Sequence, residues 1–198
     1  AYAGYDELFR RSQGTIIEVG CWAHARRKFV EAQKTSPREA HEAVVRIKQL
    51  YAVEHEAKAC DVAERRSLRQ QKSVPLLAAL EPWLDQLAVT TLPKSPLGEA
   101  ITYARNQWDA LNVYVTDGAL AMDNNLAERA VKPFAIGRKN WLFFGSDDGG
   151  RRLAILSSFT ATCQQFGVNP WTWLQQTLTK LPLAPADQLA TLLPASEK

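Results

Sequence analysis

The sequence predicts a mainly α-helical protein. Apolar side chains recur at spacings of three and four along most of the 198 residues, and only residues 15–19 form a β-branched run typical of a strand. The composition is 46% hydrophobic and 23% charged, which excludes a largely disordered chain. A domain of this size buries roughly 70% of its extended-chain surface, so we expect a real core.

In the first third of the chain, the sequence predicts a short helix, a strand and two further helices. Residues 5–11 favour a short helix, and residues 15–19 a strand between Gly14 and Gly20. A helix follows over residues 22–30. The next helix begins after Ser36, with Pro37 at its first position and Glu39 placed for a capping box. Its packing face is predicted from the helical spacing of four residues, Ala40, Val44, Ile47 and Tyr51.

The remaining elements are also helical. Residues 61–72 are almost all polar, a packing face returns over residues 75–87, and another helix begins at Ser95 and runs past Leu111. Residues 116–118 predict a turn before a short helix that Pro133 should end or kink. Apolar stripes at residues 153–166 and 171–178 predict two further helices, and residues 182–198 predict a short helix and a frayed tail.

Charge and cysteine content restrict the function classes. The net charge is only +3, so nucleic-acid binding would have to depend on local basic clusters. Three widely separated cysteines argue against a disulfide framework and favour a reducing compartment. No apolar run approaches the ~20 residues that span a bilayer, so no membrane association is expected. Because the chain does not begin with Met, we expect a processed product, a domain or a fragment.

The stretch Asp123-Asn124-Asn125-Leu126-Ala127-Glu128-Arg129 is the most informative segment. One interpretation is purely structural, with Asn125 as a helix N-cap and Glu128 completing a capping box. The alternative is a metal-dependent site acting on phosphates, because carboxylate oxygens are preferred Mg²⁺ ligands. Four cations that would suit phosphates follow Glu128 closely: Arg129, Lys132, Arg138 and Lys139. Cleavage with two Mg²⁺ ions would require at least two further carboxylates.

Three ordered blocks resemble the transposases of bacterial insertion sequences, in particular the sixty-six family. The blocks are residues 2–6, residues 20–29 and the stretch from Asp123 through Pro133 to the Gly-Arg-Lys-Asn-Trp-Leu-Phe run at 137–143. The resemblance implies an RNase H-like domain with an Asp-Asp-Glu triad, in which Glu128 is the third member and a metal ligand. The second Asp would lie directly before the block at residues 2–6, at or beside the position that precedes Ala1, so both Asp residues are expected to be absent from this chain.

The same resemblance implies an organisation in four parts. Residues 1–30 would be the end of the RNase H-like core, residues 31–115 an all-helical insertion, residues 116–181 the catalytic-glutamate helix with the C-terminal helices, and residues 182–198 a tail. The strand at residues 15–19 would be the last of a sheet that lies mostly outside this chain. Mg²⁺ or Mn²⁺ is implied for the full-length enzyme, and none is expected to bind this fragment.

Several basic and polar side chains are candidates for DNA contacts. We expect Arg138 and Lys139 to hold phosphates and Trp141 to stack on a base, although a solvated turn with Trp141, Phe143 and Phe144 in the core is an equal alternative. Further candidates are Arg129, Lys132, Arg26 and Arg27. Cys21 and His24 have a metal-like spacing, but a zinc site needs four ligands, so a packing or hydrogen-bonding role is favoured. Asp123, Asn124 and Asn125 are expected to shape the helix start.

The sequence therefore predicts the C-terminal portion of a DNA transposase that cleaves element ends and transfers strands, inactive as this fragment. The alternative is a non-enzymatic helical module for DNA binding or oligomerisation. Expected partners are element-end and target DNA, a second copy of the protein and accessory proteins of the same element. The expected location is the bacterial cytoplasm, at the nucleoid.

Overall fold

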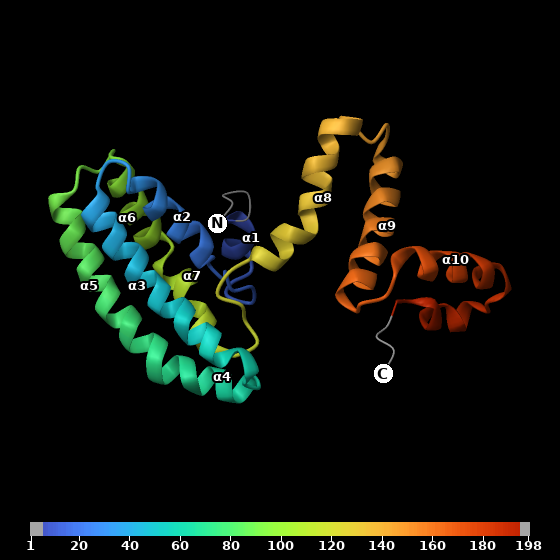
Figure 1. Ribbon diagram of the computed structural model, residues 1–198, viewed down its shortest axis with the longest axis horizontal. Helices are drawn as coiled ribbons and strands as arrows, with labels where there is room; N and C mark the ends of the chain where they lie inside the picture. Colours follow the sequence, from blue (N-terminus) through green and yellow to red (C-terminus); the bar gives the residue numbers. More distant parts are fainter. Residues whose placement is uncertain (1–5, 195–198) are drawn as a thin grey trace. The chain divides into compact units, whose positions relative to one another are not determined.

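The computed structural model describes residues 6–194, with the side chain of Asp6 excepted, and divides the chain into two compact units, Ala1–Leu126 and Ala127–Lys198. The tyrosine-containing block at residues 2–5 lies outside the described part. Within that part all regular secondary structure is helical (Figure 1). The prediction of a mainly α protein is confirmed.

The N-terminal unit holds seven α-helices among its described residues. They are α1 (Asp6–Arg11), α2 (Trp22–Ala32), α3 (Pro37–Glu56), α4 (Val62–Leu68), α5 (Val74–Thr90), α6 (Pro96–Asn106) and α7 (Trp108–Asn112). Two 3₁₀ turns, Ala57–Ala59 and Val113–Thr116, and one π turn, Arg69–Ser73, lie between them. The π turn joins α4 to α5, so the chain is helical without a break from Val62 to Thr90.

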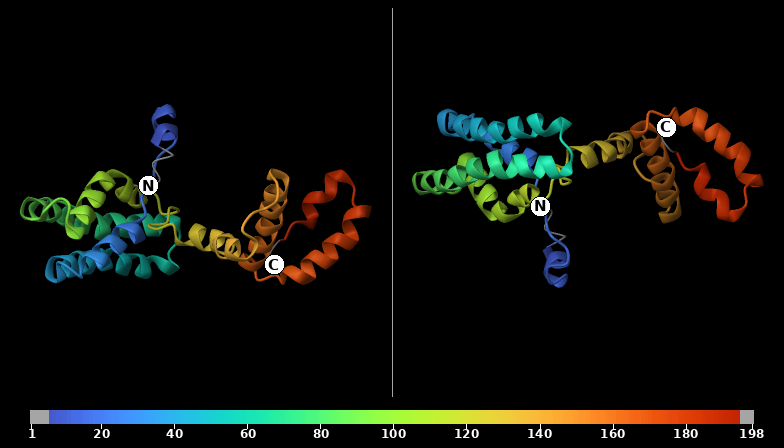
Figure 2. Two further views of the ribbon diagram at one scale, coloured as in Figure 1. Left: turned by 90° about the horizontal axis from the view of Figure 1, so that it is seen from above. Right: turned by 90° about the horizontal axis from the view of Figure 1, so that it is seen from below.

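One hydrophobic core joins five helices of this unit, α2, α3, α5, α6 and α7. Helix α2 packs against α3 and α6, and α5 packs against the same two helices, so that α3 and α5 run side by side (Figures 1 and 2). Trp22 is 1% exposed in this core, and its indole N–H donates to the carbonyl of Leu111 at 2.9 Å. Burial of each large apolar side chain contributes about 1.5–3 kcal/mol, so this unit has a substantial stabilising interior.

Helix α3 begins where the sequence predicts, but without the predicted side-chain cap. Ser36 is the N-cap and Pro37 the first residue, yet the Ser36 side chain makes no capping hydrogen bond. The predicted capping box is therefore wrong. The buried face consists of Ala40, Ala43, Ile47, Leu50 and Val53, while the predicted Val44 and Tyr51 lie at its margin, partly buried against the core.

The strand predicted for residues 15–19 does not form. A strand needs a neighbour for its backbone N–H and C=O groups, and the described part of the chain contains no other strand. The segment is irregular and is fixed by its C-terminal end, where Gly20 N–H donates to Ala110 O at 2.7 Å and Trp22 N–H to Met122 O at 3.0 Å.

The C-terminal unit contains most of α8 (Asn125–Trp141), together with α9 (Asp147–Gln165), α10 (Pro170–Lys180) and the 3₁₀ turns Leu181–Leu183 and Ala186–Leu192. Helix α8 is longer than predicted, because Pro133 lies inside it and does not end it. Asn125 is its first residue and not the residue before it, so the helix starts one residue earlier than a cap at Asn125 implies.

Packing within the C-terminal unit is sparse. The rings of Phe159 and Trp173 lie 5.2 Å apart between α9 and α10, and Trp173 Nε1 donates to Leu192 O at 3.0 Å. Among residues 127–194 only Gly137, Cys163 and Pro194 are buried. The predicted packing stripe of α9 is only partly present, because Cys163 is buried and Leu153 and Phe159 are partly buried, whereas Leu156 and Phe166 are about half exposed. Trp171, also predicted to pack, is 74% exposed.

This difference in packing predicts where a protease cuts first. Residues 142–146 between α8 and α9 are not helical, and Phe143 is 74% exposed. Exposed loops with few buried contacts open at low cost in free energy. We expect limiting chymotrypsin to cleave after Phe143 or Phe144 before any site within residues 22–122, as followed by mass spectrometry. A double variant, Phe143→Ala with Phe144→Ala, should lose this first cut, and first cuts within α2–α6 would contradict the difference in packing.

Candidate functional site

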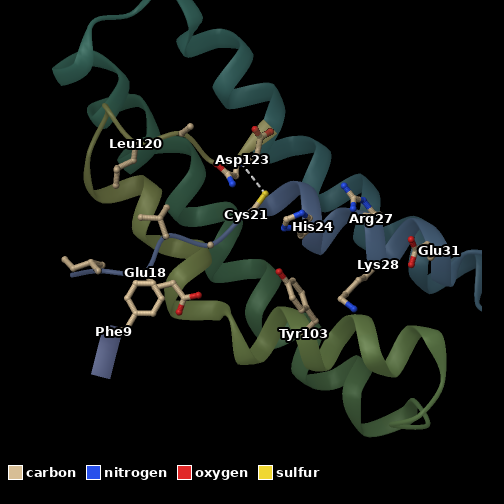
Figure 3. A pocket seen from close by; sticks show the side chains of 15 residues that line it. Phe9, Glu18, Cys21, His24, Arg27, Lys28, Glu31, Tyr103, Leu120 and Asp123 are labelled. Atoms are coloured by element: carbon tan, nitrogen blue, oxygen red, sulfur yellow. Dashed lines mark hydrogen bonds between the residues drawn. The ribbon is translucent and has the colours of Figure 1, made fainter. Parts of the chain in front are cut away.

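A pocket in the N-terminal unit brings two distant sequence blocks together (Figure 3). Its wall is formed by α2 and the segment before it, by Phe9 of α1 and Tyr103 of α6, and by residues 120, 121, 123 and 124 of the loop that leads to α8. The volume is about 890 Å³, within the range of sites that hold ligands. Of the residues singled out by sequence, Cys21, His24, Arg27, Asp123 and Asn124 line it.

The two blocks are joined by direct contacts. The backbone N–H of Asn124 donates to Cys21 Sγ at 3.3 Å, and the Trp22 N–H to the Met122 carbonyl. Cys21 therefore has a hydrogen-bonding position between α2 and the loop. These contacts link residues about a hundred positions apart in the sequence.

Both carboxylate oxygens of Asp123 accept hydrogen bonds. Oδ1 accepts from the Asn125 N–H at 3.1 Å, at the first residue of α8, and Oδ2 accepts from the Tyr51 hydroxyl at 3.2 Å. The sequence placed Tyr51 only on a packing face, and no local signal connects it with Asp123. The structure shows that α3 holds Asp123, which lies two residues before the first residue of α8.

The environment of Tyr51 disfavours its phenolate. Burial of the hydroxyl and then the neighbouring Asp123 carboxylate raise the pKa of Tyr51 well above its usual value of 10.0. Burial also raises the pKa of Tyr114 to about 12. Both groups thus stay protonated in the folded chain at pH values where an unfolded chain has lost these protons.

This linkage predicts alkaline destabilisation. Because both folded-state pKa values are raised, their contribution is complete below pH 10 and is lost as the pH rises toward 12 and above. We expect the free energy of unfolding in urea to fall between pH 10 and pH 11.5. The variant Tyr51→Phe should show a smaller fall than the unaltered chain, because one titrating group is gone. An equal fall in both proteins would contradict the assignment.

The cations of the 20–29 block lie at the surface beside this pocket. Arg26 and Arg27 are exposed on α2, and Lys28 Nζ lies 5.1 Å from the centre of the Tyr103 ring. Figure 3 shows His24, Arg27, Lys28 and Glu31 projecting from the same helix. Because the lining also carries Glu18, Glu31 and Asp123, the pocket has mixed charge.

Glu128 lies in the first turn of α8, in the C-terminal unit. Four cations follow on the same helix, all with exposed side chains: Arg129, Lys132, Arg138 and Lys139. Trp141, Phe143 and Phe144 are 43%, 74% and 45% exposed, so the alternative that places them in a core is not what this chain shows.

The described residues do not form a metal site by themselves. Within residues 6–194 no group of three or more His, Cys, Asp or Glu side chains is arranged to hold a metal ion. Of the three carboxylates in the implied Asp-Asp-Glu triad, only Glu128 is identified within these residues. The residues present therefore do not fit a two-metal centre without carboxylates from elsewhere.

A buried arginine was missed by the sequence reasoning. Arg69 lies in a segment that is almost all polar, yet it is 1% exposed and forms an ion pair with Glu54 of α3. A polar run gives no local indication that one of its members is buried.

Comparisons with known proteins cover nearly the whole chain. Residues 1–152 match the family described as "Transposase IS66 family", and residues 158–195 match the "IS66 C-terminal element". Three similar proteins of Sinorhizobium fredii (strain NBRC 101917 / NGR234) carry the names "Uncharacterized protein" y4qI, y4jD and y4hP. Their identities are 38%, 36% and 34%, and the matches cover 98%, 98% and 88% of this chain.

The chain spans only part of these relatives, namely 37%, 39% and 34% of their lengths. No solved structure matches the chain. None of the helices in residues 6–194 is long and apolar enough to cross a membrane. The two family matches, in order along the chain, lead to one conclusion: the protein belongs to the IS66 transposase family.

Proposed function

We propose that this chain is the C-terminal portion of a DNA transposase that cuts the ends of a mobile element and transfers the cut strands to target DNA. Glu128 is the third carboxylate of its Asp-Asp-Glu triad. The complete catalytic domain is RNase H-like, and the cofactor of the complete enzyme is Mg²⁺ or Mn²⁺. The protein acts in the bacterial cytoplasm, at the nucleoid.

One observation carries the proposal: the family match over residues 1–152 includes Glu128, and Glu128 lies in the first turn of the 17-residue helix α8. A side chain at a helix start projects from a defined backbone position, as a metal ligand requires.

By itself the chain supplies one carboxylate of the triad, so it is inactive under this proposal. Removing two of three metal ligands destroys a two-metal geometry. Both missing Asp residues belong to the part of the protein that this chain does not include, in keeping with its coverage of about two fifths of its relatives.

The exposed cations supply the contacts to DNA. Arg138 and Lys139 in the last turn of α8, with Arg129 and Lys132 nearer its start, are proposed to bind phosphates. Arg26 and Arg27 on α2 are proposed as a second group. Phosphate contacts give an affinity that falls as salt rises, with a slope of about −0.9 for each contact on duplex DNA.

The test is a nicking assay on element-end DNA with Mg²⁺, performed on the complete protein and on the 198-residue chain. We expect cleavage by the complete protein only, and salt-dependent DNA binding by both. Replacing Arg138 and Lys139 with Gln should reduce the salt slope by about 2, since two phosphate contacts are lost. The matched control replaces Arg10 and Arg11, two exposed cations on α1, with Gln, and its salt slope should stay that of the unaltered chain. Cleavage by the 198-residue chain alone would contradict the proposal.

A second candidate is a non-enzymatic module for DNA binding or oligomerisation. The observation that favours it is the exposure of large apolar side chains in residues 127–193, since such surfaces commonly mark interaction sites. Binding to DNA or self-association without cleavage by the complete protein would support this candidate. Cleavage that requires Glu128 would exclude it as the sole function.

A further inference from the structure

All five N–H donors of the buried Arg69 guanidinium are used. Nε and Nη2 donate to the two oxygens of Glu54 at 2.8 and 2.7 Å. Nη1 donates to the carbonyls of Tyr114 and Asp117 at 2.8 and 2.7 Å, and Nη2 also donates to Leu120 O at 2.9 Å. An arginine has five donors in a rigid fork, so this site uses its whole hydrogen-bonding capacity.

Two neighbours of Arg69 extend the same contact. Arg65 Nη1 donates to Gly118 O at 3.1 Å, and Gln70 Nε2 donates to Val115 O at 2.7 Å. Together the three side chains bind five backbone carbonyls within residues 114–120. We call residues 114–120 the strap. Loop carbonyls ordinarily bind water, so satisfaction by side chains of one helical run fixes this backbone in one conformation.

The strap also approaches α4 too closely for a side chain at its centre. A Cβ on Gly118 would lie 1.9 Å from the carbonyl oxygen of Val62, a distance that no side chain tolerates. Asp117 closes the turn locally, with its Oδ1 accepting from Ala119 N–H at 2.8 Å. Four residues after Ala119, Asp123 is held by Tyr51 and caps the first residue of α8.

We propose that Arg69, with Tyr51, is a positioning device for the first residue of α8, Asn125, which lies in the same unit and three residues before Glu128. This step rests on the proposed function. Arg69 contacts neither metal nor DNA in this scheme. Its role is to bind the strap, and through the strap and Asp123 to fix the entry into the helix.

The structural arm of the test is amide hydrogen exchange on the 198-residue chain. We compare Arg69→Lys, which keeps the charge but has three donors in place of a planar five, with Tyr51→Phe, which removes only the hydroxyl bound to Asp123. Exchange of the amides of residues 119–125 should accelerate about tenfold for each lost hydrogen bond. The control is Arg66→Met, which replaces an exposed arginine of α4, in the same unbroken helical run as Arg69. Should Arg69→Lys fail to fold, Tyr51→Phe decides the result.

The functional arm uses the complete protein in the Mg²⁺ cleavage assay. Both positioning variants should lower kcat, by roughly 10²-fold for a displacement of about 1 Å at a reacting group, with KM for DNA nearly unchanged. A residue needed only for folding would lower the active fraction and leave the kcat of the folded molecules unaltered. The positioning role is overturned if the amides of residues 119–125 exchange as slowly in both variants as in the unaltered chain. It is also overturned if exchange is faster in the variants but their kcat is unchanged.

A parallel Glu128→Gln variant separates this failure from failure of the proposed function. If Glu128→Gln still cuts DNA at the normal rate, the assignment of Glu128 is wrong and the kcat argument is overturned with it. If Glu128→Gln is inactive but the positioning variants cut normally, only the positioning role is overturned.

Discussion

Replacing Glu128 with glutamine in the complete protein is expected to reduce strand cleavage by roughly 10³-fold or more, with DNA binding retained. Glutamine preserves the length and shape of the side chain but removes the negative charge that a hard divalent cation requires. Because Glu128 is in the first turn of α8, the amide should leave the helix itself intact. The measurement is a single-turnover cleavage assay with a parallel DNA-binding titration.

A matched control for Glu128 is available in the same chain. Glu39 also lies in the first turn of a long helix, α3, and its side chain is exposed. The variant Glu39→Gln has the same loss of charge at the same kind of helix position, so it should cut DNA normally. Equal loss of cleavage in both variants would show that the effect comes from the helix start and not from a metal ligand. Normal cleavage by Glu128→Gln would remove Glu128 from the triad.

Replacing Arg69 with methionine is expected to lower the free energy of unfolding by about 3–5 kcal/mol, the usual cost of removing one member of a buried ion pair. Arg69 is 1% exposed and the Glu54 side chain only 18% exposed, so water does not readily replace the lost guanidinium. The carbonyls of the strap lose three donors at the same time. Urea unfolding followed by circular dichroism measures this change.

Two further variants make the stability measurement specific. Arg105→Met removes an ion pair with Asp85 in which both side chains are 53% exposed, and such pairs contribute about 0–1 kcal/mol. In the double variant Arg69→Met with Glu54→Leu the unpaired buried carboxylate is also gone, so part of the lost stability should return. A cost for Arg69→Met no larger than that for Arg105→Met would contradict the buried pair.

Helix positions followed from the sequence because their signals are local. Ser95 before Pro96 predicts the start of α6, and Ala40 and Ile47 mark the buried side of α3 by their spacing alone. The strand at residues 15–19 could not be judged in this way. Its β-branched residues indicate a strand, but a strand exists only with a partner, and no local pattern reports whether one is present.

The prediction that all apolar residues of α9 pack was wrong in part, for a related reason. Leu156 and Phe166 have the spacing of a packing face, which shows that a helix has an apolar side but not what covers it. Similarly, Pro133 is a helix breaker by its local chemistry, yet α8 continues to Trp141. Tertiary context can override the preference of a single residue.

The sequence by itself determined the helical class of this protein, the position of Glu128 near a helix start and, through three ordered blocks, its family. Only the tertiary structure revealed that Cys21 meets Asn124, that Tyr51 holds Asp123 and that Arg69 binds the strap. The physical reason is the distance along the sequence between the residues that make contact. Periodicity, caps and motifs are encoded over a few neighbouring residues, whereas these contacts join residues 45 to 103 positions apart and exist only after the helices have packed.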